Sequence, residues 1–248
     1  MTAGYHTLRE LQEQAVLQNR EVWEIVRNAD MSENERSAEA SFEKMTIMYQ
    51  AMKQADQSYN GALRSASGRA GGDGAKLQQY NAQGKNICGD FIGKVMEKAI
   101  KMGESNACMR RIVAAPTAGG CQAEIGSASA MAAGALASLQ GGDAETIMHA
   151  AALALKNMLG LVCDPVAGLV EVPCIKRNSC GAVNAVTSAQ LALAGIRSAI
   201  APDDVIDSMR RIGNQLPACL KETSEGGLAV TESARAYQRH SNKRRIEK

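Results

Sequence analysis

Residues 122–159 read QAEIGSASAMAAGALASLQGGDAETIMHAAALALKNML, and this stretch decides the fold class. It predicts two alanine-rich helices, at about 122–139 and 144–159, with Gly141 and Gly142 between them. Asp143 can cap the second helix by accepting a hydrogen bond from its first amide groups. The apolar side chains of that helix recur at helical spacing: Ile147, Ala151, Leu155 and Met158.

The composition extends this prediction to the rest of the chain. Only 3% of the 248 residues are aromatic, so the core must be built from aliphatic and small side chains, which suits helices that approach closely. No proline precedes Pro116, so nothing interrupts long helices in the first half. We expect a mainly α fold: one catalytic domain of packed helices at 1–238, with loops that carry the site, and a polar basic tail at 239–248.

The remaining segments also favour helices. Residues 5–69 are interpreted as two polar helices, the first ending near 28–30 and the second opening at 32–35 with the capping-box pattern Ser-Glu-Asn-Glu. An apolar face of the second helix is expected to serve packing alone: Met45, Ile47, Met48, Met52 and Leu63. Further helices are predicted at about 89–102, 179–199 and 203–212. By contrast, 161–174 contains two prolines with a glycine between them and is predicted to be an ordered loop.

Charge and hydropathy exclude several function classes. The net charge is +2, from 28 basic and 26 acidic residues, so no strong field favours nucleic acid or anionic lipid. No apolar run reaches the roughly 18 residues of a membrane span. The amino terminus has charges where a signal peptide is apolar. We therefore expect a cytoplasmic chain without a nucleic-acid or membrane partner.

Seven cysteines, an odd number without a secretion signal, favour free thiols, metal or redox chemistry over a disulfide framework. Cys121 lies at a predicted helix start, where the helix dipole favours a thiolate. Cys163 and Cys174 flank the proline-containing loop. No Cys-x-x-Cys pair occurs, so zinc ribbons and ferredoxin-type carriers lack their spacing. Three simply buried thiols remain an alternative, and that role is expected for the other four: Cys88, Cys108, Cys180 and Cys219.

Two further features give weaker signals. The glycine-rich segment 68–76 does not match a phosphate-binding loop, because Ala75 precedes its lysine and Leu77 follows it. None of the three histidines lies in a motif, so the sequence identifies no general base.

Several motifs resemble the α chain of bacterial iron–sulfur-dependent L-serine dehydratases, over nearly the whole chain apart from its tail. The most specific is GLVCDPVAGLVEVPCIKRN at 160–178, followed by GAVNA at 181–185. The others are SASG at 65–68 with GGD at 71–73, IVAAPTAG at 112–119, GCQAE at 120–124, and KET at 221–223 with GGLAV at 226–230.

The resemblance implies a chemistry and its residues. Family members hold a [4Fe–4S] cluster with three cysteines, and the matching positions here are Cys121, Cys163 and Cys174. The family eliminates water from L-serine and releases pyruvate and ammonia. An iron without a cysteine ligand acts there as a Lewis acid toward the serine hydroxyl. Lys176 and Asn178, which follow the last cysteine, and the hydroxyls of Thr117 and Ser67 are the candidate catalytic groups.

The chain departs from the family at one place. Relatives carry a few dozen more residues between the Pro-Thr-Ala-Gly and Gly-Cys-Gln-Ala-Glu motifs, whereas Gly119 here joins Gly120 directly. A shortened chain could be an inactive or regulatory scaffold, and an iron–sulfur cysteine desulfidase is another alternative. The family also needs a β portion with a Ser-Ser-Ser-His-Thr motif, absent from this sequence. The resemblance therefore implies a separate β chain, a heterodimer, and a shared face near the cysteine loop and Gly68–Gly74.

Overall fold

A computed structural model describes residues 5–65, 67–84, 87–109 and 120–237, with no side chains for 107–109, and its regular elements are helices. In chain order they are α1 (Leu8–Gln18), α2 (Val22–Glu33), α3 (Ser37–Gln57), α4 (Asp73–Ala82), α5 (Gly89–Met109), α6 (Cys121–Leu139), α7 (Ala144–Lys156), η1 (Val166–Gly168), α8 (Cys174–Leu193), α9 (Pro202–Gln215), η2 (Ala218–Leu220) and η3 (Gly227–Val230). Among the described residues the β structure is limited to one parallel bridge between Cys163 and Lys221. The predicted mainly α single domain is confirmed.

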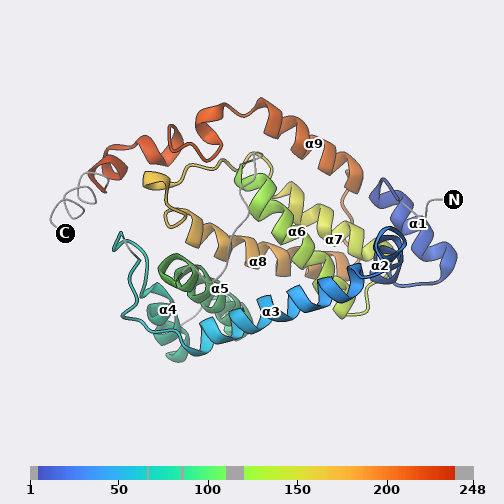
Figure 1. Ribbon diagram of the computed structural model, residues 1–248, viewed down its shortest axis with the longest axis horizontal. Helices are drawn as coiled ribbons and strands as arrows, with labels where there is room; N and C mark the ends of the chain where they lie inside the picture. Colours follow the sequence, from blue (N-terminus) through green and yellow to red (C-terminus); the bar gives the residue numbers. More distant parts are fainter. Residues whose placement is uncertain (1–4, 66, 85–86, 110–119, 238–248) are drawn as a thin grey trace.

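Helices α6, α7 and α8 pack against one another at the centre of the molecule (Figure 1). Their shared core consists largely of alanines, among them Ala133, Ala137, Ala150 and Ala185. The approach of α8 to α6 requires Gly181, because a Cβ there would lie 2.7 Å from the Cγ2 of Ile125. The small-residue composition therefore sets how closely these helices pack.

Polar contacts inside this bundle join the three central helices. The Ser129 hydroxyl donates to the carbonyl of Gly181 (2.8 Å), and Asn184 donates to the Ser129 hydroxyl (2.9 Å) and to the carbonyl of Ala154 (2.9 Å). Buried polar groups stabilise a fold only when they are hydrogen-bonded, and here Ser129 and Asn184 find their partners on neighbouring helices.

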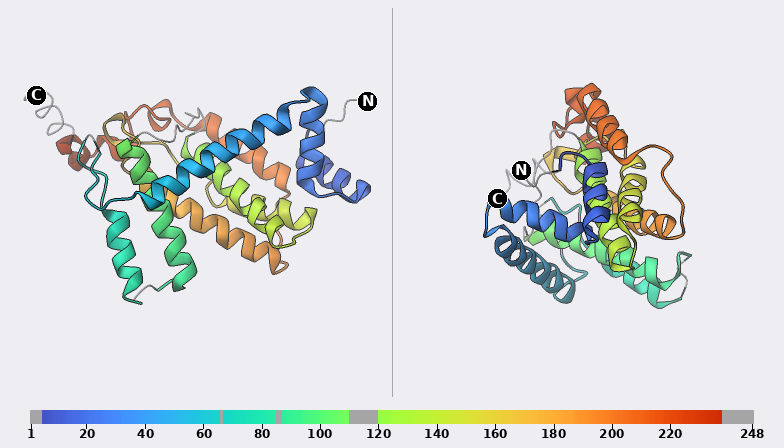
Figure 2. Two further views of the ribbon diagram at one scale, coloured as in Figure 1. Left: turned by 60° about the horizontal axis from the view of Figure 1, so that its bottom comes forward. Right: turned by 90° about the vertical axis from the view of Figure 1, so that its right-hand side faces the viewer.

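The other helices surround this centre. Helices α4 and α5 form an adjacent pair that projects from one side (Figure 2). Helix α9 packs on α7, and Asp203 in its first turn accepts hydrogen bonds from the amides of Leu8 (2.7 Å) and Arg9 (3.1 Å). This carboxylate therefore ties the start of α1 to α9.

The predicted organisation of 5–69 is wrong in two respects. Three helices form instead of two, because Asn19 takes the left-handed conformation (φ 49°) and ends α1. The capping box forms at the start of α2, between Glu21 and Glu24. Ser32 lies instead in the last turn of that helix, where its hydroxyl donates to the Ala29 carbonyl (2.7 Å). Asparagine tolerates positive φ better than other non-glycine residues, and a helix pattern does not show this break.

The expected packing role of the α3 side chains is also wrong. Met45, Ile47, Met48 and Met52 are exposed, and Leu63, which follows the helix, is half-buried. Phe42 and Met45 line an apolar groove of about 1450 Å³ between α2 and α3 on one side and α6 and α7 on the other. Helical periodicity identifies an apolar face, but it does not say whether the chain supplies something to cover it.

The remaining boundaries shift by a few residues. Asp143 caps α7 as predicted, by accepting from the Thr146 amide (2.8 Å). Helix α8 starts five residues earlier than predicted, at Cys174, and α5 extends to Met109. None of the helices that the structure describes is long and apolar enough to cross a membrane. The tail predicted at 239–248 lies outside the described residues.

Candidate functional site

Three cysteines from separate parts of the chain meet at one end of the central bundle. Cys121 is the first residue of α6, Cys174 is the first residue of α8, and Cys163 lies between them in the cysteine loop, residues 161–174. All three side chains are buried, and Cys121 and Cys163 pack together. Helix starts bring the first and third into place, and the bridge to Lys221 fixes the second: the Cys163 amide donates to Leu220 (2.9 Å).

The thiols lie in an environment that disfavours their charged form. Burial raises the pKa of all three, that of Cys174 to about 12, and the mutual repulsion of their thiolates adds to this for Cys163 and Cys174. Nearby positive charge from Arg177 acts in the opposite direction on Cys121 and Cys174. The metal-free thiols are therefore neutral at pH 7, and binding a metal would release their protons.

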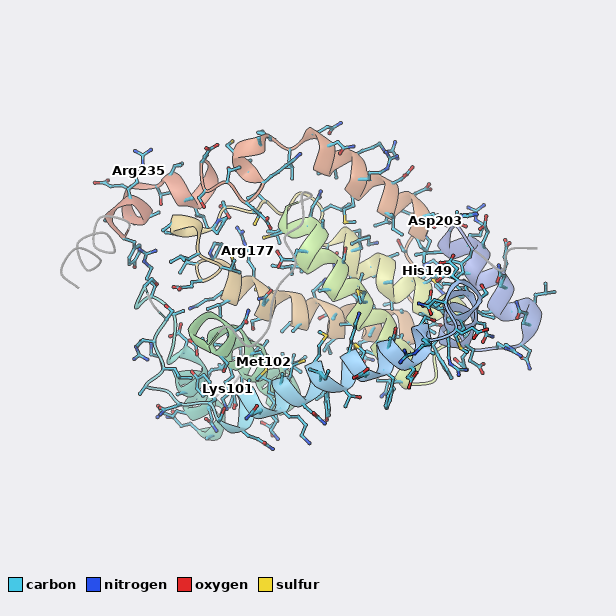
Figure 3. The ribbon with its side chains drawn as sticks, viewed as in Figure 1. Lys101, Met102, His149, Arg177, Asp203 and Arg235 are labelled. Carbon is cyan, nitrogen blue, oxygen red and sulfur yellow. The ribbon has the colours of Figure 1, made fainter. Side chains whose placement is uncertain are left out.

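Arg177 is the cation of this site. Its guanidinium donates to the Asp164 carboxylate (2.7 Å) and to the carbonyl of Val162 (2.9 Å), and it lies 3.9 Å from the Cys121 sulfur. Figure 3 shows it pointing from the first turn of α8 toward the start of α6. Burial alone would lower the pKa of Arg177, but the ion pair with Asp164 raises it, so the guanidinium stays charged beside the thiols.

Asp164 also fixes the carboxyl-terminal segment to the cysteine loop. Its side chain is almost fully buried and accepts from the amide of Leu228 (2.8 Å) in addition to Arg177. Gly227 has φ +57°, and a Cβ there would come within 2.5 Å of the Asp164 carboxylate. The Ser224 hydroxyl donates to the carbonyl of Pro165 (2.6 Å). Gly227 and Asp164, which belong to motifs far apart in the sequence, therefore contact each other.

A second buried carboxylate, Glu171, joins the cysteine loop to the serine turn, residues 65–68. Its Oε2 accepts from the hydroxyls of Ser65 (2.8 Å) and Ser67. The serine turn is closed by bonds between Ser65 and Ala70: the Ser65 amide donates to the Ala70 carbonyl (2.9 Å) and the Ala70 amide donates to the Ser65 hydroxyl (3.2 Å). Ser67, a predicted site residue, therefore lies against the cysteine loop. Sequence reasoning missed Glu171 and Asp164 as site residues, although both belong to the 160–178 motif.

The other predicted catalytic groups have different positions. Lys176 is exposed, and its ammonium group pairs with the Asp73 carboxylate at 2.5 Å. The hydrogen bonds from Lys176 and Lys76 lower the pKa of Asp73. Asn178 is exposed on α8. Thr117 lies outside the described residues.

Asp73 begins α4, whose start is held by Glu104 of α5. This fully buried carboxylate accepts from the amides of Asp73 (2.9 Å) and Gly74 (3.1 Å) and from the Tyr59 hydroxyl. Burial, followed by the bond to Glu104, raises the pKa of Tyr59 to about 12. The glycine turn before α4 thus presents Asp73 to Lys176 from a fixed backbone.

The two histidines in the described part of the chain, His6 and His149, have partners other than the three cysteines. His149 accepts from the Ser198 amide (3.2 Å) and faces Glu145 and Arg197 on the α7 surface; burial, with a contribution from Arg197, lowers its pKa. His6 is exposed, and its amide bonds Glu10. His240 lies outside the described residues. Of the four cysteines expected to be buried, Cys88 and Cys180 are exposed and Cys219 is half-buried, so that prediction is wrong; the side chain of Cys108 lies outside the described part.

The donors of the three cysteines are thiol sulfurs, the ligand type that holds iron–sulfur clusters. Within the described ranges, no group of three or more cysteine, histidine or carboxylate side chains is arranged around one metal ion. A cluster has no such requirement, because each thiolate binds a different iron. The three buried thiols interact electrostatically beside the Arg177 guanidinium, and they are the described side chains that would bind such a cluster.

Comparisons with known proteins agree over most of the chain. The family described as "Serine dehydratase alpha chain" matches residues 17–119 and 118–229. The chain is 40% identical over 258 residues to "Probable L-serine dehydratase, alpha chain" of Bacillus subtilis, with 85% of this chain and 86% of that protein covered. It is 39% identical over 212 residues to "L-serine dehydratase, alpha chain" of Peptoniphilus asaccharolyticus, covering 66% and 73%. It is 50% identical over 112 residues to "L-serine dehydratase" of Streptomyces coelicolor, covering 45% and 25%.

The same comparisons place the departure noted in the sequence. The two matched stretches overlap at 118–119, just before Gly120 and Cys121. The alignment with the Bacillus subtilis protein spans 258 residues, more than the 248 of this chain, so it includes positions that this chain lacks.

Proposed function

Because this chain belongs to the serine dehydratase alpha chain family, we propose that it is the α chain of an iron–sulfur-dependent L-serine dehydratase. The reaction is β-elimination of water from L-serine to aminoacrylate, which hydrolyses to pyruvate and ammonia. The observation that carries the proposal is the convergence of three buried thiols from α6, the cysteine loop and α8, beside Arg177.

Cys121, Cys163 and Cys174 would hold a [4Fe–4S] cluster as thiolates. When bound, the cluster supplies an iron without a cysteine ligand, a Lewis acid for the departing hydroxyl. Arg177 lowers the electrostatic cost of the thiolates, because its positive charge is held beside Cys121 and cannot be lost near neutral pH. Asp164 keeps that guanidinium in place.

Lys176, Asn178, Ser67 and Thr117 are the proposed substrate-binding groups. Lys176 carries a positive charge at the exposed end of α8. There the carboxylate of L-serine could replace Asp73 as its ion-pair partner. The two hydroxyls can donate to or accept from the substrate. We assign no general base to this chain.

We also propose a separate β chain as partner. The Bacillus subtilis and Peptoniphilus asaccharolyticus relatives are both named as α chains. A β chain would complete the site from the side of the cysteine loop and the glycine turn at 68–74. The chain alone is then expected to be weakly active or inactive.

One observation favours a second candidate, a scaffold subunit without activity: the family match is divided into two stretches, which overlap at 118–119, just before Cys121. Anaerobic purification, alone and with the β chain, distinguishes the two. A dehydratase α chain should be brown, contain iron and form pyruvate from L-serine when its partner is present. A colourless chain that contains no iron, with no pyruvate formed by the complex, would support the scaffold.

A further inference from the structure

Glu171 is a buried carboxylate whose negative charge has no cation partner among the described residues. Its exposed fraction is 7%, and its recorded side-chain partners are the hydroxyls of Ser65 and Ser67. Asp164, the other buried carboxylate of the cysteine loop, is paired with Arg177. A buried carboxylate without a counter-charge is costly unless a partner arrives from outside.

The hydroxyls around Glu171 are arranged to accept further hydrogen bonds. Ser65 and Ser67 each have one proton, and both are directed at Oε2 of the carboxylate. The Ser67 oxygen also accepts from the Arg69 amide (3.2 Å) and lies 3.2 Å from the Ser65 hydroxyl oxygen, whose proton is directed at Glu171. With its proton engaged, Ser67 can offer a ligand only a lone pair, so it suits a donor such as an ammonium group and not a carboxylate.

The second carboxylate oxygen of Glu171 is available to such a donor. Both serine bonds end on Oε2, and within the described part of the chain no group donates to Oε1. Glu171 as a whole keeps 7% of its surface exposed. Ser67, whose hydroxyl donates to the same carboxylate, is half-buried.

We propose that Glu171 Oε1 and Ser67 Oγ form the subsite for the ammonium group of the amino-acid substrate. The subsite rests on the proposed function, and it assigns the two charged ends of the substrate to different residues. Glu171, three residues before Cys174, binds the positive end of the substrate. Lys176, two residues after Cys174, faces the negative end.

The test compares two ligands that differ by the ammonium group, L-alanine and propionate. Neither has the β-hydroxyl that elimination requires, so calorimetry on the anaerobically purified complex measures binding without turnover. Glu171→Gln keeps the shape and an oxygen acceptor for the two serines but removes the charge. A lost charged hydrogen bond corresponds to an affinity for L-alanine about tenfold to a hundredfold weaker. The affinity for propionate should change by less than about twofold, because propionate has no ammonium group. A twofold change corresponds to RT ln 2, which is smaller than the free energy of a charged hydrogen bond.

Glu104→Gln is the matched control, because it removes another buried carboxylate that has no access to a ligand. It should change both affinities in the same proportion. Ser67→Ala keeps the test decisive if Glu171→Gln fails to fold: it should weaken L-alanine more than propionate. Equal weakening of both ligands by the Glu171 and Ser67 variants, or no effect, would overturn the subsite. If the wild-type complex neither binds L-alanine nor forms pyruvate from L-serine, the proposed function fails, and the subsite fails with it.

Discussion

The cysteine loop and helix α3 are opposite in construction. In the loop, both buried carboxylates have close partners, Asp164 in Arg177 and Glu171 in two serine hydroxyls, and distant segments contribute to one site. Helix α3 has a single buried residue, Ala55, and exposes most of its apolar side chains. The comparison teaches that buried polar contacts hold the cysteine loop in place, whereas much of α3 contributes little to stability in the described structure.

The largest effect is expected where the loop's charge network is broken. Asp164→Ala leaves Arg177 without its carboxylate and the Leu228 amide without its acceptor. Breaking a buried pair in this way costs about 3–5 kcal/mol. Chemical denaturation of the metal-free protein measures the free energy of unfolding. Asp164→Asn, which removes the charge but keeps an oxygen acceptor for the Leu228 amide, should cost less. Equal losses would show that the acceptor contributes nothing beside the charge, and would contradict the role given to the Leu228 contact.

A smaller effect is expected at the contact of α6 and α8, which aligns Cys121 with Cys174. Gly181→Ala places a methyl group 2.7 Å from Ile125, and such overpacking costs about 1–3 kcal/mol. Gly134→Ala on α6 is the control, since its nearest neighbour would lie 3.6 Å away. There the gain in helix propensity should leave stability unchanged or raised by up to about 1 kcal/mol. Similar losses at both sites would contradict the packing argument.

The cap of α7 should contribute about 1 kcal/mol, and the contribution should depend on pH. Hydrogen bonds from Thr146, through its side chain and its amide, lower the pKa of Asp143 below its usual value of 3.8. The stabilisation by the ionised carboxylate is fully present above the usual pKa of 3.8. It is lost as the pH falls through the lower pKa of the folded state. Asp143→Ala should therefore be clearly less stable at pH 7, with the difference shrinking at pH 3. A difference that grows in acid would contradict the sign.

The smallest effect is expected on α3. Met48→Gln should change the free energy of unfolding by less than about 0.5 kcal/mol, because the side chain is half exposed and leaves no cavity. Ile175→Ala, beside Cys174 and 2% exposed, should cost about 2–5 kcal/mol. A large loss at Met48 would show that α3 is buried in solution, by a second copy or a partner.

Local signals predicted much of this architecture. Gly141, Gly142 and Asp143 mark the break between α6 and α7, and the prolines mark the cysteine loop, because each acts through its own backbone chemistry. What could not be predicted depends on contacts between distant segments. Nothing near Glu171 in the sequence indicates the serines 104 and 106 positions away, and the periodicity of α3 did not reveal that its apolar face is exposed.

The site residues divide in the same way. Cys121 was identifiable from its position at a predicted helix start, and Cys163 and Cys174 from their positions beside the proline-containing loop. The family motif indicated all three. Lys176 and Ser67 were identifiable from the motif alone. Their partners, Asp73 and Glu171, required the fold, because an ion pair between α4 and α8 has no sequence signature.

The most direct test of the central claim is the iron content of cysteine variants purified without oxygen with their β chain. Serine at 121, 163 or 174 should each remove most of the iron and the broad visible absorbance, since each thiolate binds a different iron. Serine at the exposed Cys88 or Cys180 should leave both unchanged. Equal iron loss from both groups of variants, or full iron content in the Cys163→Ser protein, would contradict the account.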